Sequence, residues 1–241
     1  MRIQAGTRIT FSHKSELPRA YVESLQPLVW KAYSGGIKDL DFANKRIGVV
    51  SAIVIGKCLE LNGSLTSLNL NGNDVGHRGG AAIGEALRKN TALTSLDLGA
   101  NKLGAEGAAA VAKHLKVNKG PLATLDLSWN AIGARGAAAI GDALQANETL
   151  TSLQLFSNEI DAEGAAALAD GFKVNTKLAE LNLSDNSLGD DGGAAIGAES
   201  LEVNQSLTLL DLRYKCVPPP IALSGAQHRI RTAPCRVCVP L

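Results

Sequence analysis

The chain has 241 residues, of which 45% are hydrophobic and 20% are charged, and this balance excludes a wholly disordered protein. Aromatic residues make up only 4% while glycine occurs 25 times, so the core must be aliphatic and must use small residues. The net charge of +1 conceals an acidic body, because residues 37–211 carry 14 basic and 21 acidic residues, and such a body disfavours nucleic-acid binding.

No run of about 18 apolar residues is present, so the sequence predicts neither a membrane-spanning helix nor a membrane partner. The N-terminus has no continuous apolar segment after its basic residues, which disfavours a cleaved secretory signal. Four cysteines are too few for a disulfide scaffold in a chain of this length. We therefore predict a reducing, cytoplasmic setting.

Residues 1–36 precede the first regular unit and are predicted to form a degenerate N-terminal cap. Ile9 and Phe11 alternate with polar residues, as in a short strand, and residues 17–33 have the apolar content of a helix interrupted at Pro27. Atypical terminal units are expected wherever a stack of repeats meets solvent.

A single pattern recurs from residue 37 onward, L-x-x-L-x-L-x-x-N followed two residues later by Leu, Ile or Val. The full copies begin at Leu65, Leu93, Leu122, Leu150 and Leu178, at spacings of 28, 29, 28 and 28 residues. A weaker copy begins at Ile37 and a truncated one at Leu207. Leucines that alternate with polar residues predict a short strand with one buried face.

The second half of each copy carries two large apolar residues four positions apart, which places both on one face of a helix. These pairs are Ile55 and Leu59, Ile83 and Leu87, Val111 and Leu115, Ile140 and Leu144, and Leu168 and Phe172. A strand and a helix of this size cannot cover each other, whereas stacked neighbours can. The sequence therefore predicts an α/β solenoid over residues 37–216, a curved horseshoe with parallel strands on the concave side and helices on the convex side.

Two series of asparagines keep the repeat spacing. The first lies where each strand turns toward its helix, and we predict that its amides satisfy buried backbone groups and link adjacent repeats. This turn ladder comprises Asn73, Asn101, Asn130, Asn158 and Asn186. The second lies near each helix end, where we predict the left-handed cap conformation that asparagine tolerates. This cap ladder comprises Asn62, Asn90, Asn118, Asn147, Asn175 and Asn204.

Only glycine or alanine occurs at one inner helix position of the repeats. The residues are Gly56, Gly84, Ala112, Gly141, Ala169 and Gly197. Because glycine costs roughly 1 kcal/mol relative to alanine in a helix, we predict that adjacent helices approach closely there. The glycines keep the repeat spacing and form no G-x-x-x-x-G-K-[ST] loop, so no nucleotide or other cofactor is predicted.

These features together resemble leucine-rich repeats of the ribonuclease-inhibitor type, a subtype also found in NOD-like receptors and in the Ran GTPase-activating protein. The resemblance rests on the spacing of 28 or 29 residues, the turn asparagines and the Gly/Ala-rich helices over residues 37–216. It implies a scaffold for protein recognition whose strand side is the usual docking surface, without implying one chemistry.

The last full unit carries one extra residue near Glu199 and Ser200, which predicts a bulge or distortion of its helix. Residues 217–241 lose the pattern, begin with prolines and contain no acidic residue, and they predict an irregular or disordered basic tail. The tail's Cys235 and Cys238 form one C-x-x-C pair, half of what a zinc site requires, so no metal site is predicted.

Residues between the two strand leucines form a polar column that should lie side by side on the exposed face of the sheet. Its candidate partner-binding members are Asp97, Asp126, Gln154, Asn182 and Asp211. Aromatic residues follow the strands at Trp129, Phe156 and Tyr214, where other repeats carry small residues, and Asp185 flanks them. Because Trp and Tyr often anchor interfaces, we predict a docking patch for a protein partner with a basic or hydroxyl-rich segment. The alternatives are a merely solvated strand face and aromatics that shield the turn.

No arrangement of nucleophile, base or paired carboxylates indicates catalysis, so we predict a non-catalytic interaction module with no catalytic residue. The main alternative is regulation of a small GTPase, by resemblance to the Ran GTPase-activating protein, although the acidic C-terminal region of that protein is replaced here by a basic tail. A third hypothesis is a fragment of a larger receptor of the NOD-like type. No individual residue of the chain is matched to contact residues of those proteins.

Overall fold

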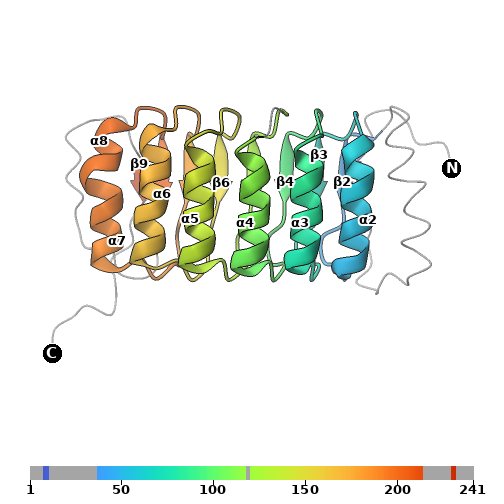
Figure 1. Cartoon of the computed structure of the whole chain (residues 1–241), viewed down its shortest axis with the longest axis horizontal. Coiled ribbons are helices and arrows are strands. Elements are labelled where there is room, and N and C mark those ends of the chain that lie inside the picture. The colour runs from blue at the N-terminus through green and yellow to red at the C-terminus, as the bar shows by residue number, and fades with distance from the viewer. Residues whose placement is uncertain (1–7, 11–36, 118–119, 214–228, 232–241) are drawn as a thin grey trace.

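The computed structural model describes residues 8–10, 37–117, 120–213 and 229–231, which form a row of strands backed by a row of helices (Figure 1). The strands are β1 (Arg8–Thr10), β2 (Asp39–Asp41), β3 (Ser67–Asn69), β4 (Ser95–Asp97), β5 (Thr124–Asp126), β6 (Ser152–Gln154), β7 (Glu180–Asn182), β8 (Leu209–Asp211) and β9 (Arg229–Arg231). The helices are α2 (Gly48–Leu61), α3 (Gly76–Leu87), α4 (Gly104–Leu115), α5 (Gly133–Leu144), α6 (Ala162–Val174), α7 (Gly189–Ala195) and α8 (Leu201–Val203), with a π-helical turn η1 (Ile196–Ser200) between the last two.

Of the predicted cap, residues 1–36, the described part is β1. Of the predicted irregular tail, residues 217–241, the described part is β9, so those three residues are a strand.

All of these strands pair in parallel, and their order in the sheet is their order in the sequence, β1 to β9. The register places the central leucines of successive strands opposite one another, as with Leu68, Leu96 and Leu125. The helices α2 to α6 stand side by side in front of the sheet, and α7, η1 and α8 form the last column of the row, end to end (Figure 1). The predicted α/β solenoid is therefore confirmed.

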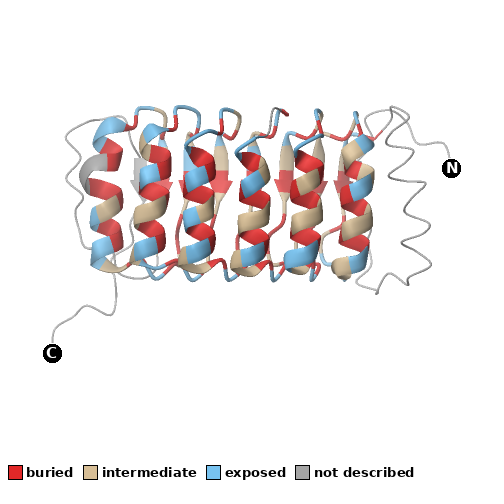
Figure 2. Ribbon diagram, viewed as in Figure 1, coloured by how far each residue is buried: buried red, intermediate tan, exposed pale blue. Residues whose placement is uncertain are grey.

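The core lies between the sheet and the helices. In the first full repeat, the strand leucines Leu68 and Leu70 are 2% and 0% exposed, and the helix residues Ile83 and Leu87 are 0% and 2% exposed. Figure 2 shows buried and exposed residues alternating along each helix, so that each helix has one buried and one exposed face. Each buried side chain contributes roughly 1.5–3 kcal/mol. That contribution requires the next repeat as a cover, so the repeats stabilise one another.

The turn ladder links each repeat to the one before it. Asn130 Oδ1 accepts the N–H groups of Asn101 (3.0 Å) and Leu103 (3.1 Å) in the preceding repeat. Asn130 Nδ2 donates to the carbonyl oxygens of Leu98 (2.9 Å) and Leu127 (2.9 Å). Every member of the ladder accepts the N–H of the equivalent residue in the preceding repeat. The amides thus satisfy buried backbone groups of two repeats at once.

Asn118 of the cap ladder lies outside the described residues, and the other members have a different conformation from the predicted one. Asn62 and Asn175 are extended, with φ of −84° and −73°, where we expected the left-handed region. The extended backbone lets each side chain serve two repeats. Asn90 Nδ2 donates to the carbonyl oxygens of Leu59 (2.8 Å) and Asn62 (2.7 Å) in the preceding repeat, while its Oδ1 accepts the N–H of Leu93 (2.7 Å) in its own. These bonds between repeats decide the conformation.

The extra residue of the last full repeat lies in the π-helical turn η1. Ile196 and Leu201 are 0% and 1% exposed although they are five positions apart, where the other repeats use four. Ser200 is buried between them, and its Oγ donates to the carbonyl oxygen of Ala195 (3.3 Å). The predicted distortion is confirmed. It keeps the apolar residues on both sides of the insertion facing the core.

The inner Gly/Ala position is where adjacent helices come closest. A Cβ placed on Gly56 would lie 2.7 Å from the carbonyl oxygen of Ala82, and one on Gly84 would lie 3.0 Å from that of Ala110. A methyl group does not fit 2.7 Å from a backbone oxygen, and one at 3.0 Å fits only if the neighbouring helix shifts slightly, as it can where the position holds Ala112 or Ala169. The predicted close approach of the helices is confirmed.

Candidate functional site

The strand face is the side of the sheet turned away from the helices, and it consists of the first and third residues of strands β2 to β8. Within these strands it carries carboxylates and no lysine or arginine. The carboxylates are Asp39, Asp41, Asp97, Asp126, Glu180 and Asp211. The strand face is therefore acidic and polar.

The polar column of the strand face also terminates the strands. Asp97 Oδ1 accepts the N–H of Gly99 (2.8 Å), and Asp126 makes the same bond to the residue two positions later. Equivalent bonds are made by Asp41, Asn69, Asn182 and Asp211. Gln154, which is one methylene longer, donates from Nε2 to Ser152 Oγ (3.3 Å). The turn itself thus favours Asp or Asn at this position. The sequence analysis missed this role, although the recurrence of Asp and Asn in one column signalled it.

Asp211 differs from the other predicted surface residues because its charge is paired within the chain. Arg213 Nε donates to Asp211 Oδ1 (2.9 Å) and Arg213 Nη2 donates to Oδ2 (2.6 Å), a bidentate pair. The Asp211 side chain is only 7% exposed. We therefore exclude Asp211 from the candidate surface, which corrects the sequence prediction. Tyr214, also predicted, lies outside the described residues.

Asp97 and Asp126 lie opposite each other on the neighbouring strands β4 and β5. Burial raises the pKa of Asp97 and the negative charge of Asp126 adds to the effect, while hydrogen bonds from Gly99 and Asn71 oppose it. Like charges at directly opposite positions destabilise a sheet. The fold does not require this pair, because Asn182 makes the same turn bond in the same column without a charge.

Trp129 and Phe156 contact each other across adjacent repeats and are called the aromatic pair below. Their ring centroids lie 5.3 Å apart and their planes meet at 78°, an edge-to-face arrangement. The backbone N–H of Trp129 donates to the carbonyl oxygen of Phe156 (2.9 Å). Phe156 is half-buried while Trp129 is 57% exposed. The two predicted aromatic residues therefore form one unit that leaves much of the indole in solvent.

Trp129 has a left-handed backbone conformation, with φ of 59°. The equivalent residues of other repeats share this conformation and are Asn44, Gly72, Ala100, Ser157 and Asp185. The left-handed region costs an L-residue about 1–2 kcal/mol, and bulky residues are rare in it. The backbone therefore favours glycine or a short polar residue here, and the tryptophan is present at a cost to stability.

The remaining predicted residues belong to the strands beside the aromatic pair. Gln154 on β6 lies between Asp126 on β5 and Asn182 on β7 in the same column. Asn182 Oδ1 accepts the N–H (3.0 Å) and the O–H (2.6 Å) of Ser184. Asp185 is half-buried at the left-handed position of its repeat. The candidate surface thus spans β4 to β7, with the aromatic pair where the strands turn toward the helices.

The repeat units match a known family. The family model described as "Leucine Rich repeat" matches residues 62–84, 89–112, 121–141, 146–169 and 174–197, and each segment contains one strand and the start of the next helix. The chain is a leucine-rich repeat protein. No curated protein matches its sequence.

Two solved structures are similar to this leucine-rich repeat protein. "Leiomodin-1 Actin-Binding Site 2 (ABS2)" is 28% identical with a TM-score of 0.47, over 54% of this chain and 75% of that chain. "Crystal structure of TLR13-ssRNA13 complex" is 19% identical with a TM-score of 0.44, over 73% of this chain and 29% of that chain. Both likenesses are too distant to carry an argument about function.

Other features of the leucine-rich repeat protein lie apart from the candidate surface. A groove of about 330 Å³ separates the loops that follow α6 and α8, and its walls include Val174 and Val203 but none of the predicted surface residues. In the described part of the chain, no group of His, Cys, Asp and Glu side chains is suited to bind a metal ion. Among the described helices, none is long and apolar enough to cross a bilayer. Cys235 and Cys238 lie outside the described residues.

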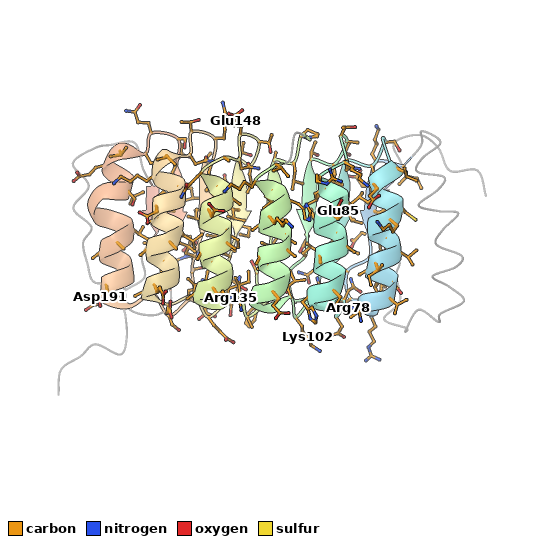
Figure 3. The ribbon with its side chains drawn as sticks, in the orientation of Figure 1. Arg78, Glu85, Lys102, Arg135, Glu148 and Asp191 are labelled. Atoms are coloured by element: carbon orange, nitrogen blue, oxygen red, sulfur yellow. The ribbon has the colours of Figure 1, made fainter. Side chains whose placement is uncertain are left out.

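His114 is a partly buried titratable group on the helix side, apart from the candidate surface. Its side chain on α4 is 14% exposed, its Nε2 lies 3.4 Å from Glu85 Oε2 on α3, and its Nδ1 has no hydrogen-bond partner. Glu85 lies on the helix side, which faces the viewer in Figure 3. Burial lowers the pKa of His114, the charges of Lys113 and Arg88 add to this, and Glu85 opposes it.

We expect His114 to make the protein less stable in mild acid. Because its pKa is lower in the folded state than the unfolded value of about 6.5, protons bind the unfolded chain more tightly. The contribution of His114 to stability is therefore complete above about pH 6.5 and is lost as the pH falls through the folded pKa. Thermal melts between about pH 7 and pH 5 should show a steeper loss of Tm for the wild type than for His114→Gln. His77→Gln, which replaces an exposed histidine, is the control and should keep the wild-type slope. An equal slope for the wild type and His114→Gln would contradict the assignment.

Proposed function

We propose that this leucine-rich repeat protein is a non-catalytic interaction module whose protein partner docks on the strand face around the aromatic pair. The observation that carries the proposal is Trp129, a large apolar side chain that is 57% exposed at a left-handed backbone position. Tryptophan is enriched at the energetic centres of protein interfaces. Since the fold would be better served by glycine here, binding explains the residue where folding does not.

Two simpler explanations account for less. A tryptophan that shielded the turn would be buried against it, whereas more than half of the Trp129 side chain is in solvent. A strand face that only contacts solvent does not explain why Asp97 and Asp126 are both aspartates at opposite positions, because an asparagine makes the same turn hydrogen bond without charge repulsion.

The charge of the strand face favours a partner with a basic segment. Strands β2 to β8 carry carboxylates and no basic residue. Among these carboxylates, that of Asp211 forms an ion pair with Arg213. Complementary charge speeds association and selects among partners more than it adds affinity. The apolar area of the aromatic pair then supplies most of the affinity.

The ribonuclease-inhibitor subtype and a cytoplasmic setting belong to the same proposal. The repeat spacing of 28 or 29 residues supports the subtype. A free Cys58 thiol, whose pKa burial raises, is consistent with a reducing compartment. The regulation of a small GTPase and the receptor fragment stay predictions of the sequence resemblance alone.

Replacing Trp129 by glycine should abolish partner binding while leaving the fold intact. Glycine relieves the left-handed strain of about 1–2 kcal/mol, which offsets the loss of the ring contact with Phe156, worth about 0.5–1.5 kcal/mol. We therefore expect an unchanged free energy of unfolding, within about 1 kcal/mol, and at least about thirtyfold weaker binding of the captured partner.

The matched control is Leu61→Ala, which removes an equally exposed apolar side chain from α2 on the helix side. Proteins captured from a cell extract by the full chain should be retained by Leu61→Ala and lost by Trp129→Gly. A Trp129→Gly protein that is folded by circular dichroism and binds with wild-type affinity would overturn the proposed function.

A further inference from the structure

The opposed carboxylates on β4 and β5 are incompletely satisfied by the chain itself. One oxygen of each binds backbone: Asp97 Oδ1 accepts the N–H of Gly99 and Asp126 Oδ1 that of Ser128, both at 2.8 Å. In the described part of the chain, neither Asp97 Oδ2 nor Asp126 Oδ2 receives a hydrogen bond or an ion pair. By contrast, Asp211 on β8 is bound by Arg213. The central pair therefore presents two half-used carboxylates at opposite positions of adjacent strands, whose backbones lie about 4.8 Å apart.

Trp129 of the aromatic pair lies on the same strand-to-turn segment as Asp126. Asp126 caps the N–H of Ser128, and the next residue is Trp129. The edge-to-face contact with Phe156 and the backbone hydrogen bond between the two residues hold this part of the turn. The exposed indole is the best of the aromatic faces for a cation. A carboxylate and an aromatic surface thus stand within one turn, with a second carboxylate on the neighbouring strand.

We infer that this part of the strand face is a seat for an arginine side chain, presented by an extended basic segment of the protein partner that crosses strands β4 to β6. The inference rests on the proposed function, because it names the chemistry that docks at the same surface. The guanidinium binds Asp126 and Asp97 through their second oxygens, and its plane covers the indole of Trp129. The charge of the arginine relieves the repulsion that the two carboxylates otherwise impose on the sheet.

Arginine fits this seat better than lysine for geometric reasons. A planar guanidinium offers several N–H donors in one plane, so it can bridge two carboxylates on adjacent strands and stack on a ring at the same time. An ammonium group is a strongly hydrated point charge that does neither as well. Beyond the seat, Gln154 and Ser152 on β6 are neutral hydrogen-bonding groups, suited to the backbone of the crossing segment.

The test uses the full chain with Trp30→Phe, which leaves Trp129 as the one tryptophan of the protein. The probes are blocked pentapeptides of glycine and serine that differ at the central residue: arginine, lysine, glutamate, or citrulline, the neutral isostere of arginine. The shift of the Trp129 indole N–H resonance gives the affinity for each peptide. We expect saturable, salt-sensitive binding of the arginine peptide, about threefold to tenfold weaker binding of the lysine peptide, and at least about tenfold weaker binding of the citrulline and glutamate peptides.

The chain itself offers matched variants. Asp97→Asn with Asp126→Asn removes both charges while keeping the turn bond, because asparagine fills the same column at Asn69 and Asn182. This double variant should bind the arginine peptide about tenfold or more weakly than the wild type, and its Tm should be unchanged or higher. Asp142→Asn removes the same charge from the helix side, where Asp142 pairs with Lys116, and should leave peptide binding unchanged.

The failures of the two proposals are distinguishable. Equal affinities for the arginine and citrulline peptides, or full arginine affinity in the double Asp→Asn variant, would overturn the arginine seat. If Trp129→Gly still loses the captured partner in that case, the strand face remains the docking surface and only its chemistry is wrong. Partner binding that survives Trp129→Gly removes the proposed function and the seat with it.

Discussion

Replacing Asn130 by alanine is expected to lower the free energy of unfolding by about 3–5 kcal/mol. The Asn130 side chain is 1% exposed. Its loss strands the N–H groups of Asn101 and Leu103 and the carbonyl oxygen of Leu98, in the preceding repeat. The carbonyl oxygen of Leu127 loses one of two donors and keeps Asn158 Nδ2 (3.0 Å). Each stranded buried group costs about 1–3 kcal/mol, and partial rearrangement or water entry keeps the total below the sum.

Urea unfolding of the full chain measures this loss, and Asn147→Ala is the comparison. Asn147 is as buried, at 3%, but its amide makes fewer hydrogen bonds to described residues: it accepts from Thr149 (3.1 Å) and Leu150 (2.8 Å) and donates to Leu115 (2.9 Å). The cost of Asn147→Ala should therefore be smaller. If the two variants cost the same, the number of backbone groups served does not set the energy of the ladders.

The repeat architecture was predictable because its signals are local and occur many times. A leucine at every second strand position and an apolar pair four apart in each helix determine which face is buried, whatever the rest of the chain does. The distortion caused by the insertion in the last repeat could be predicted for the same reason. A helix that must bury both Ile196 and Leu201 at a spacing of five has to widen one turn, and η1 is that turn.

The conformations of the loops were less predictable because they depend on neighbouring repeats. For the cap ladder, both the left-handed and the extended backbone suit an asparagine, and the carbonyl oxygens of the preceding repeat, such as that of Leu59 for Asn90, select the extended one. Left-handed residues lie instead on both sides of the turn ladder, as Ala100 and Lys102 do around Asn101. At the position before each turn asparagine, glycine marks this conformation only at Gly72, whereas Ala100 and Trp129 conceal it.

The candidate surface was predictable in composition but not in how its residues are used. The column of Asp97 and Asp126 was expected on the exposed face and lies there. Its turn-capping role and the pairing of Asp211 with Arg213 require coordinates, because they depend on where a side chain points after the strand ends. The conformational cost of Trp129 could not be predicted either, because a single aromatic residue in a sequence does not reveal its φ angle.

Gly141→Ala is expected to destabilise the protein by about 2–3 kcal/mol, although alanine is favoured over glycine inside a helix by roughly 1 kcal/mol. The new Cβ would overlap the carbonyl oxygen of Ala167 and lie 2.8 Å from its carbonyl carbon. Both atoms belong to the backbone of α6, so neither can move without moving the helix. Separating α5 from α6 would also weaken the contact at Gly171, whose own Cβ position is filled by the backbone of Gly141.

The matched control is Gly80→Ala in α3, the same substitution at a buried helix position where the obstacle is different. A Cβ there would meet Leu103 Cδ2 at 2.8 Å, the end of a side chain that can turn away, and the next nearest atoms lie 3.6 Å away. Gly80→Ala should therefore be tolerated within about 1 kcal/mol, because the gain in helix propensity offsets a small rearrangement. Urea midpoints should rank Gly80→Ala well above Gly141→Ala. The reverse order would mean that the helices of the solenoid slide apart freely, and then the Gly/Ala column would have no steric reason to exist.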